Sequence, residues 1–286
     1  MVFSTLVSTA DLAHHLAEAN WVICDCRHDL LEPDTGRSAH ARAHIPGAHF
    51  LHIDEDLSGP KLGQNGRHPL PQADKLTARL GGIGVDRDSQ VIAYDAHGGM
   101  FAARLWWLLR WLGHEAVAVL DGGIPKWIAE GRPITADSAP ARPRTFERSP
   151  GILPVNATFV LTHLDGHGMR LLDARAAERF AGQNETLDPV AGHIPGALNR
   201  YFKLNLDERG GFKPADLLRK EFKALLLETS SRELVHYCGS GVTACHNLLA
   251  MEHAGLSGSR LYPGSWSEWC ADPGRPVAHG ALSRLD

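Results

Sequence analysis

The sequence predicts an α/β protein of two domains in tandem, each a small parallel sheet flanked by helices. The chain has 286 residues, which gives room for two domains of roughly 150 residues each. A set of landmarks recurs once at about half the length, as an internal duplication would produce. Short apolar runs alternate with longer helical stretches, the pattern of a parallel sheet covered on both faces.

The duplication consists of four landmarks that recur in the same order. The offset is 148–149 residues for the first two pairs and 142–143 for the last two, so the first half carries a longer connection within residues 50–75. The pairs are Trp21–Asp25 with Arg170–Asp173, His44–Ala48 with His193–Ala197, Gln90–Tyr94 with Glu233–Tyr237, and Asp121–Gly123 plus Trp127 with Pro263–Ser265 plus Trp269.

Within each half, β-branched or apolar runs predict strands, and longer periodic stretches predict helices. Gly255 closes the clearest helix of the second half as its C-cap. The predicted strands include Val22–Cys24, Val91–Ala93 and Val117–Leu120, and the predicted helices include Ala102–Leu112 and Val242–Ala254.

Residues 133–155 hold five prolines and few apolar residues, the composition of an inter-domain linker. We therefore predict an N-terminal domain at 1–140, a linker at 141–155 and a C-terminal domain at 156–286.

Composition excludes several classes of protein. Hydrophobic content of 43% and charged content of 22% are those of a globular chain. A net charge of −4 is too balanced for nucleic-acid binding. We expect a cytoplasmic protein without a membrane partner, since no apolar run approaches about 20 residues and Met1–Ala10 does not resemble a signal peptide. Five cysteines are an odd number in a large chain, so reduced thiols are expected.

The segment around Cys238 carries the strongest chemical signal. Cys238 follows an apolar strand and precedes a predicted helix. Gly239 and Gly241 permit positive φ, so successive N–H groups can converge at the positive end of the helix. Such a loop stabilises a thiolate, and we expect a partly exposed sulfur nucleophile. The first half has Asp95 at the same point of the repeat, which points to function at Cys238 and not to a common role in the fold.

The sequence gives less support to other roles for the cysteines. Cys24, Cys26, Cys245 and Cys270 are read as small buried hydrophobes. A tyrosine phosphatase loop needs an arginine six residues after its cysteine, where this chain has Ala244. No local signature of a cysteine protease surrounds Cys238. His236 shares a face with Cys238 along the strand, and a core or wall role is expected for it.

These motifs resemble the tandem-domain rhodanese family, which includes thiosulfate and 3-mercaptopyruvate sulfurtransferases. The resemblance covers nearly the whole chain. It implies a non-catalytic N-terminal domain, in which Asp95 replaces cysteine, and a catalytic C-terminal domain. It also implies ping-pong chemistry through a persulfide on Cys238, with no metal and no organic cofactor. The motifs that carry it are the two His-Ile-Pro-Gly segments, Asp121–Gly123 with Trp127, Pro263–Trp266 with Trp269, and Cys238–Ala244.

The resemblance also suggests the sulfur donor. The loop Gly239-Ser240-Gly241-Val242-Thr243 is typical of the family's mercaptopyruvate enzymes and lacks the basic residues common in its thiosulfate enzymes. By the same resemblance, Arg179 would bind the donor's carboxylate. Mercaptopyruvate enzymes usually carry a second arginine about nine residues later, but Leu187–Pro189 occupies that stretch. We hypothesise that Arg67, in the first-half insertion, compensates from across the domain cleft.

Some family members are proposed to use a Ser-His-Asp relay, and Ser240, His68 and Asp54 occupy matching positions. A histidine can shuttle a thiol proton near neutral pH when a carboxylate orients it. Such a relay requires the first-half insertion to lie over the Cys238 loop. The alternative is that His68 is only a loop residue.

Two other functions stay open at this point. The first is a thiosulfate:cyanide sulfurtransferase, which the missing second arginine favours. The second is a persulfide carrier or binding module without catalysis of its own. The expected partners are a small-molecule sulfur donor and an acceptor such as cyanide, thioredoxin or another thiol, and a monomer is expected because an internal cleft can build the site without a second subunit.

Overall fold

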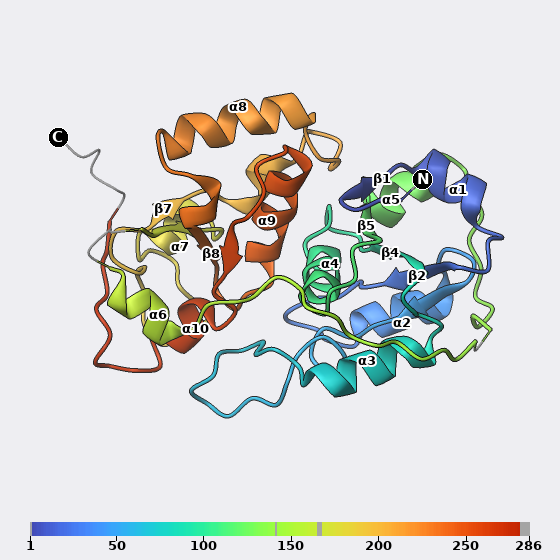
Figure 1. The fold of residues 1–286 in the computed structure, drawn as a ribbon, viewed down its shortest axis with the longest axis horizontal. Coiled ribbons are helices and arrows are strands. Elements are labelled where there is room, and N and C mark those ends of the chain that lie inside the picture. The colour runs from blue at the N-terminus through green and yellow to red at the C-terminus, as the bar shows by residue number, and fades with distance from the viewer. Residues whose placement is uncertain (1, 141, 165–167, 281–286) are drawn as a thin grey trace. The chain divides into compact units, whose positions relative to one another are not determined.

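The computed structural model describes residues 2–140, 142–164 and 168–280 (Figure 1). Their contacts divide the chain into two compact units that exchange short segments. The first unit contains 1–59, 70–152 and 207–212, and the second contains 60–69, 153–206 and 213–286. Residues 60–69, which include Arg67 and His68, therefore pack with the second unit.

The first unit is built on a five-stranded parallel sheet in the order β1-β5-β4-β2-β3. In the central pair, Cys24 of β2 lies opposite Ala93 of β4. The elements are β1 (Leu6–Val7), α1 (Thr9–His15), β2 (Trp21–Asp25), α2 (Thr35–Arg42), β3 (Ala48–Phe50), α3 (Ala73–Gly82), β4 (Gln90–Tyr94), α4 (Ala102–Trp111), β5 (Val117–Leu120) and α5 (Gly123–Ala129).

The second unit repeats this plan with a four-stranded parallel sheet in the order β7-β6-β8-β9. Its central pair aligns Leu172 of β6 with His236 of β8. The elements are α6 (Ala157–Thr162), β6 (Arg170–Asp173), α7 (Ala177–Phe180), β7 (Leu198–Asn199), the 3₁₀ turns η1 (Phe202–Asn205) and η2 (Ser231–Glu233), α8 (Ala215–Leu226), β8 (Leu234–Tyr237), α9 (Thr243–His253), β9 (Arg260–Leu261) and α10 (Ser265–Trp269).

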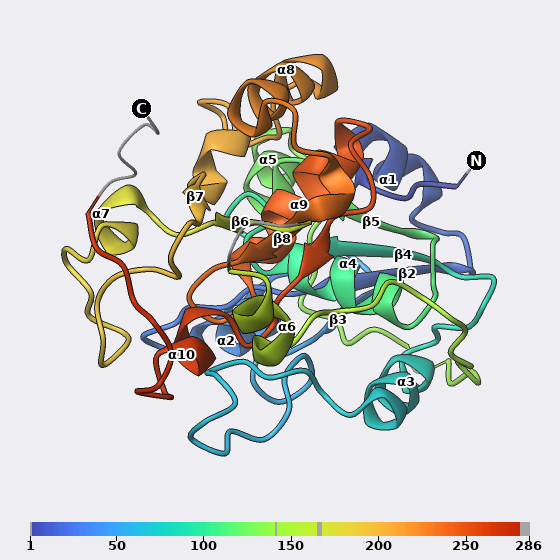
Figure 2. The same cartoon turned by 60° about the vertical axis from the view of Figure 1, so that its left-hand side comes forward.

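The central strands are buried on both faces of their sheets. Consecutive side chains point to opposite faces of a sheet, and all those of β4 and β8 are buried. On one face of the first sheet, Ile23, Ile92 and Ala118 pack with Leu12 of α1 and Trp127 of α5. In the second unit, α6 and α10 pack against one face of the sheet in the same way. Figures 1 and 2 show α8 and α9 on the opposite side of β8 from α6 and α10.

The repeat predicted from the sequence is visible in matching hydrogen bonds. The Tyr94 hydroxyl accepts the Ile45 N–H at 3.3 Å, and the Tyr237 hydroxyl accepts the Ile194 N–H at 3.2 Å. The predicted strands and the helices α4 and α9 are confirmed within one residue at most ends. The two parallel sheets confirm the predicted fold class.

Candidate active site

Cys238 lies at the carboxyl end of β8, where a parallel sheet presents ligand-binding loops. The loop Gly239–Val242 leads directly into α9. Gly241 has φ +77°, and a Cβ there would lie 2.3 Å from the Pro263 carbonyl oxygen. Any larger residue would displace this backbone, so the tight turn after Cys238 requires glycine at position 241.

The thiol of Cys238 is turned back onto its own loop. The Gly241 N–H donates to Sγ at 3.1 Å. The residue is only 2% exposed, so the expectation of a partly exposed sulfur was wrong. An N–H aimed at sulfur stabilises an anionic thiolate or persulfide more than a neutral thiol.

Residues at the start of α10 form hydrogen bonds with the backbone of Cys238. The Cys238 N–H donates to Ser265 Oγ at 3.1 Å, and the Cys238 carbonyl accepts the Trp266 N–H at 3.0 Å. Ser265 has φ +56°, and the residue at its point in the first repeat, Gly123, has φ +58°. A serine in this conformation is strained, and its hydroxyl compensates by holding Cys238.

Segment 60–69 makes polar contacts with the Cys238 loop and with α10. The Arg67 N–H donates to Ser267 Oγ at 3.0 Å. His68 Nδ1 lies 2.7 Å from Ser240 Oγ, and both residues are buried. The structure thus brings Ser240 and His68 together, as the relay hypothesis requires, whereas Asp54 belongs to the first unit.

Two arginines converge on Gly239. A Cβ at Gly239 would lie 2.8 Å from Arg67 Nη2 and 3.6 Å from each terminal nitrogen of Arg179. Arg179 lies on α7 and binds Glu185 at 2.8 Å and Asp188 at 3.3 Å. Arg67 Nη1 also binds Asp188. Arg67 and Arg179, the two residues predicted to bind the donor's carboxylate, therefore both lie beside Gly239.

The two carboxylates beneath the arginines are buried, with side chains 2% exposed. Burial raises the pKa of Asp188, although the hydrogen bond and charge of Arg67 oppose the rise. Burial also acts to raise the pKa of Glu185, but hydrogen bonds from Arg179 and from the Leu187 amide lower it overall.

The remaining residues of the loop lie at the start of α9. Val242 is buried and caps the start of α9, and Thr243 is the first, partly buried residue of that helix. Behind them His236 is fully buried, and burial lowers its pKa to about 3. His236 therefore belongs to the buried core of the second unit, as expected.

The sequence analysis missed three residues at this site: Ser265, Glu185 and Asp188. Ser265 could have been found, because it replaces Gly123 at the same point of the repeat. Asp188 gave no signal, since its contact with Arg67 joins residues 121 positions apart in sequence. Glu185 pairs with Arg179, six residues before it, and no motif in the sequence marked that pair.

The equivalent loop of the first unit is occupied by its own side chain. The Asp95 carboxylate accepts N–H groups from four residues at 2.7–2.9 Å. The Asp95 carbonyl accepts the Ile124 N–H at 3.0 Å, as Cys238 accepts that of Trp266. An internal anion therefore fills the cradle of amides in this domain. The donors are His97, Gly99, Phe101 and Ala102.

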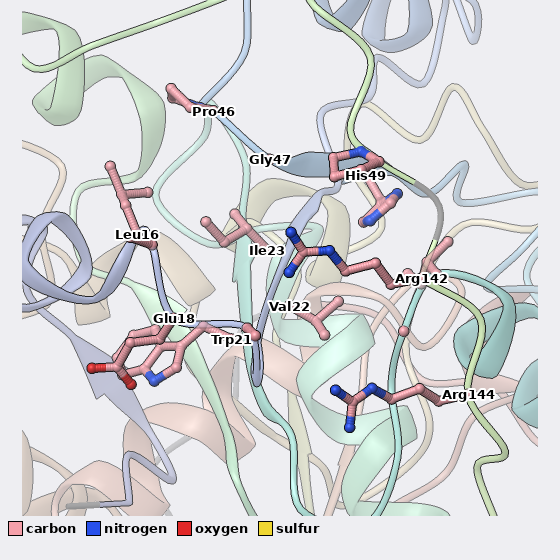
Figure 3. Close-up of a pocket in the computed structure, with 15 residues that line it drawn as sticks. Leu16, Glu18, Trp21, Val22, Ile23, Pro46, Gly47, His49, Arg142 and Arg144 are labelled. Carbon is pink, nitrogen blue, oxygen red and sulfur yellow. The ribbon is translucent and has the colours of Figure 1, made fainter.

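A separate cavity of about 260 Å³ lies in the first unit (Figure 3). It is lined by the starts of β2 and β3 and by Arg142 and Arg144. These strand ends are opposite to the end that carries Asp95, so the cavity is remote from that loop. Within the described ranges, no group of three or more His, Cys, Asp or Glu residues could hold a metal ion. None of the helices described is long and apolar enough to cross a membrane.

Comparisons with known proteins agree on one family. A model of the rhodanese-like domain matches residues 8–130 and again 156–272. A Pseudomonas aeruginosa protein named "Probable 3-mercaptopyruvate sulfurtransferase" is 47% identical over 98% of this chain and 100% of its own length. A Mycobacterium tuberculosis protein provisionally named thiosulfate sulfurtransferase SseB is 37% identical over 96% of this chain and 97% of its own.

Solved structures give the same result. The crystal structure of SseA from Escherichia coli, described as a 3-mercaptopyruvate sulfotransferase, aligns with a TM-score of 0.79 at 30% identity. The alignment covers 92% of this chain and 99% of that one.

Proposed function

Because the chain belongs to the rhodanese family, we propose that it is a sulfurtransferase that moves sulfane sulfur from 3-mercaptopyruvate to a thiophilic acceptor through a persulfide on Cys238. The observation that carries this proposal is the Cys238 loop, in which the Gly241 N–H points at Sγ and two guanidinium groups lie beside Gly239. The full-length similarity to the P. aeruginosa relative supports the choice of donor.

In the first half-reaction, the Cys238 thiolate attacks the sulfur of the donor. An S–S bond forms and the C–S bond of mercaptopyruvate breaks, and its electron pair passes to the carbon to give the enolate of pyruvate. The thiol proton of the donor moves to that carbon, which yields pyruvate and an anionic persulfide. The Gly241 N–H that points at Sγ would also stabilise the terminal persulfide sulfur.

Ser240 and His68 would carry that proton. His68 Nδ1 is 2.7 Å from Ser240 Oγ, close enough for proton transfer between the two side chains. Imidazole can accept and return a proton near neutral pH. In the proposed relay, Asp54 is the carboxylate that would orient His68.

Arg67 and Arg179 would bind the carboxylate of the donor, since a guanidinium group matches a carboxylate in geometry and charge. The backbone of Gly239, Gly241, Val242 and Thr243 would line the sulfur end of the donor. This arrangement would direct the sulfur of mercaptopyruvate toward Cys238.

In the second half-reaction, a nucleophilic acceptor attacks the terminal persulfide sulfur and the Cys238 thiolate leaves. Cyanide would leave as thiocyanate, and a thiol such as that of thioredoxin would leave as a persulfide. All the proposed groups come from one chain, so we propose that the active form is a monomer. We also propose that it is cytoplasmic.

We propose that the N-terminal domain, 1–140, is non-catalytic. Its equivalent loop already holds the Asp95 carboxylate, which is not a sulfur nucleophile. The linker 141–155 would connect it to the catalytic domain, 156–286, and segment 60–69 would be its contribution to the site.

Two observations favour thiosulfate as an alternative donor. Position 188, nine residues after Arg179, carries an aspartate, and a relative at 37% identity carries a thiosulfate sulfurtransferase name. Thiosulfate would deliver its outer sulfur to Cys238 and leave as sulfite.

Single-turnover loading of purified protein tests both donors, with Cys238→Ser as the control. Faster persulfide formation from 3-mercaptopyruvate than from thiosulfate, absent in the control, is the expected result. Faster loading from thiosulfate would overturn the proposed donor but keep the nucleophile. Loading by neither donor would leave a carrier or binding module.

A further inference from the structure

The carboxylate of Asp188 connects the two arginines beside the Cys238 loop. One of its oxygens binds Arg67 Nη1 and the other lies 3.3 Å from Arg179 Nη2. The Asp188 side chain is 2% exposed, whereas those of Arg67 and Arg179 are 29% and 22% exposed. The acid therefore lies beneath the arginines, and the arginines face outward.

Each guanidinium group divides its nitrogen atoms between the acids and the loop. Arg67 uses Nη1 for Asp188 and turns Nη2 toward Gly239. Arg179 uses Nε and Nη2 for Glu185 and Asp188, and its Nη1 lies as close to Gly239 as its Nη2 does. One terminal nitrogen of each arginine therefore stays directed at the loop that carries the nucleophile.

The charges in this group balance. Two guanidinium groups beside each other repel, and the two buried acids offset that repulsion. Glu185 binds Arg179 directly at 2.8 Å, and Arg175 Nη1 lies 3.4 Å from the same carboxylate. The acidic partner of Arg67 is Asp188.

We propose that Asp188 is a positioning residue whose carboxylate bridges Arg67 and Arg179 and so directs one nitrogen of each toward the anionic group of the sulfur donor. This inference rests on the proposed function for the identity of the donor. Asp188 binds an arginine from segment 60–69. This arginine takes the place of the basic residue that is absent at position 188. It does not touch the reacting atoms.

The test compares Asp188→Asn with Glu221→Gln. Glu221 is a matched control, because it also bridges two cations in the second unit, Arg200 at 2.7 Å and Lys213 at 2.8 Å. For Asp188→Asn we expect the KM for 3-mercaptopyruvate to rise about 10-fold while kcat changes by less than about 2-fold, since a guanidinium–carboxylate contact with the donor is weakened. The control should change neither constant.

Two further variants separate positioning from a general structural effect. Asp188→Glu keeps the negative charge, so its KM should return most of the way to that of the parent protein. In an Arg67→Met background, Asp188→Asn should raise KM by less than about 3-fold, because the arginine that it positions is already absent. Independent, multiplicative effects of the two substitutions, or a fall in kcat at constant KM, would overturn the inference.

A binding measurement keeps this test separate from the proposed reaction. Pyruvate is titrated calorimetrically into the Cys238→Ser protein with and without Asp188→Asn, and a Kd weakened about 10-fold is expected. If thiosulfate proves to be the donor, the same pair of proteins is titrated with thiosulfate. Equal Kd values for the donor's anion in the two proteins would overturn the inference, whichever donor is correct.

Discussion

The Nδ1 atom of His68 lies 2.7 Å from the hydroxyl oxygen of Ser240, although 172 residues separate the two along the chain. Both side chains are buried, and segment 60–69 packs with the unit that contains Cys238. A histidine in this position can serve the proton transfer that mercaptopyruvate requires.

We predict that His68→Asn lowers kcat with 3-mercaptopyruvate by about 100-fold, the usual contribution of a positioned acid–base group. Loading from thiosulfate should change much less, because thiosulfate brings no thiol proton to transfer. The measurement is steady-state turnover with each donor in parallel.

His163→Asn is the control for this prediction. His163 lies at the end of α6 in the same unit and hydrogen-bonds locally to the Phe159 carbonyl at 2.8 Å. Its replacement should leave both donors unaffected. Full kcat with mercaptopyruvate in His68→Asn would remove the relay from the mechanism.

For Arg67→Met we predict a KM for 3-mercaptopyruvate about 10-fold higher, because a guanidinium–carboxylate contact is lost. The side chain of Arg67 approaches Gly239, so its removal should act on donor binding more than on the sulfur transfer itself. Arg232→Met, an exposed arginine of the same unit, is the control. An unchanged KM in Arg67→Met would exclude Arg67 from donor binding.

The Asp95 carboxylate should stabilise the first domain. Asp95→Ala leaves four N–H groups without this acceptor, three of them in buried hydrogen bonds, so we predict a loss of about 3 kcal/mol in the free energy of unfolding. Asp34→Asn, whose side chain is 88% exposed, should cost less than about 0.5 kcal/mol. Chemical denaturation of both variants measures the difference, and equal stabilities would show that Asp95 is not the structural anion of its loop.

His236 makes stability depend on pH. Burial lowers its folded pKa to about 3 from the ordinary value of 6.5, so between these values only the unfolded chain takes up the proton. Stability is therefore lost as pH falls below 6.5, by about 1.4 kcal/mol per pH unit from this group. Neither ring nitrogen has a hydrogen-bond partner among the described residues.

His236→Leu should remove that dependence. The variant should be more stable than the parent protein by about 1 kcal/mol at pH 7, where an unpaired imidazole is costly, and the advantage should grow as pH falls from 6.5 to 4. Urea denaturation at several pH values measures the difference. A difference that stays constant with pH would contradict the buried, neutral imidazole.

Much of the fold could be predicted because its signals are local. Apolar runs such as Val117–Leu120 and the periodic stretch of α4 identify strands and helices by spacing alone. The repeat then marked Cys238 as the position that differs from its counterpart, Asp95. Burial of Cys238 was not predicted, because the loop's approach to its own sulfur is decided by the φ angle of Gly241 and by the packing of Pro263 against it.

The duplicated α/β architecture, the family and the cysteine at the end of β8 could all be predicted from the amino-acid sequence, because each depends on motifs of residues close together in the chain. Which charges meet at that cysteine depends on the tertiary fold. Arg67 and Asp188 are 121 residues apart, and no periodicity or motif relates them. Only folding of segment 60–69 onto the second unit brings the guanidinium group to the carboxylate, since a buried acid needs a cation wherever the packing can provide one.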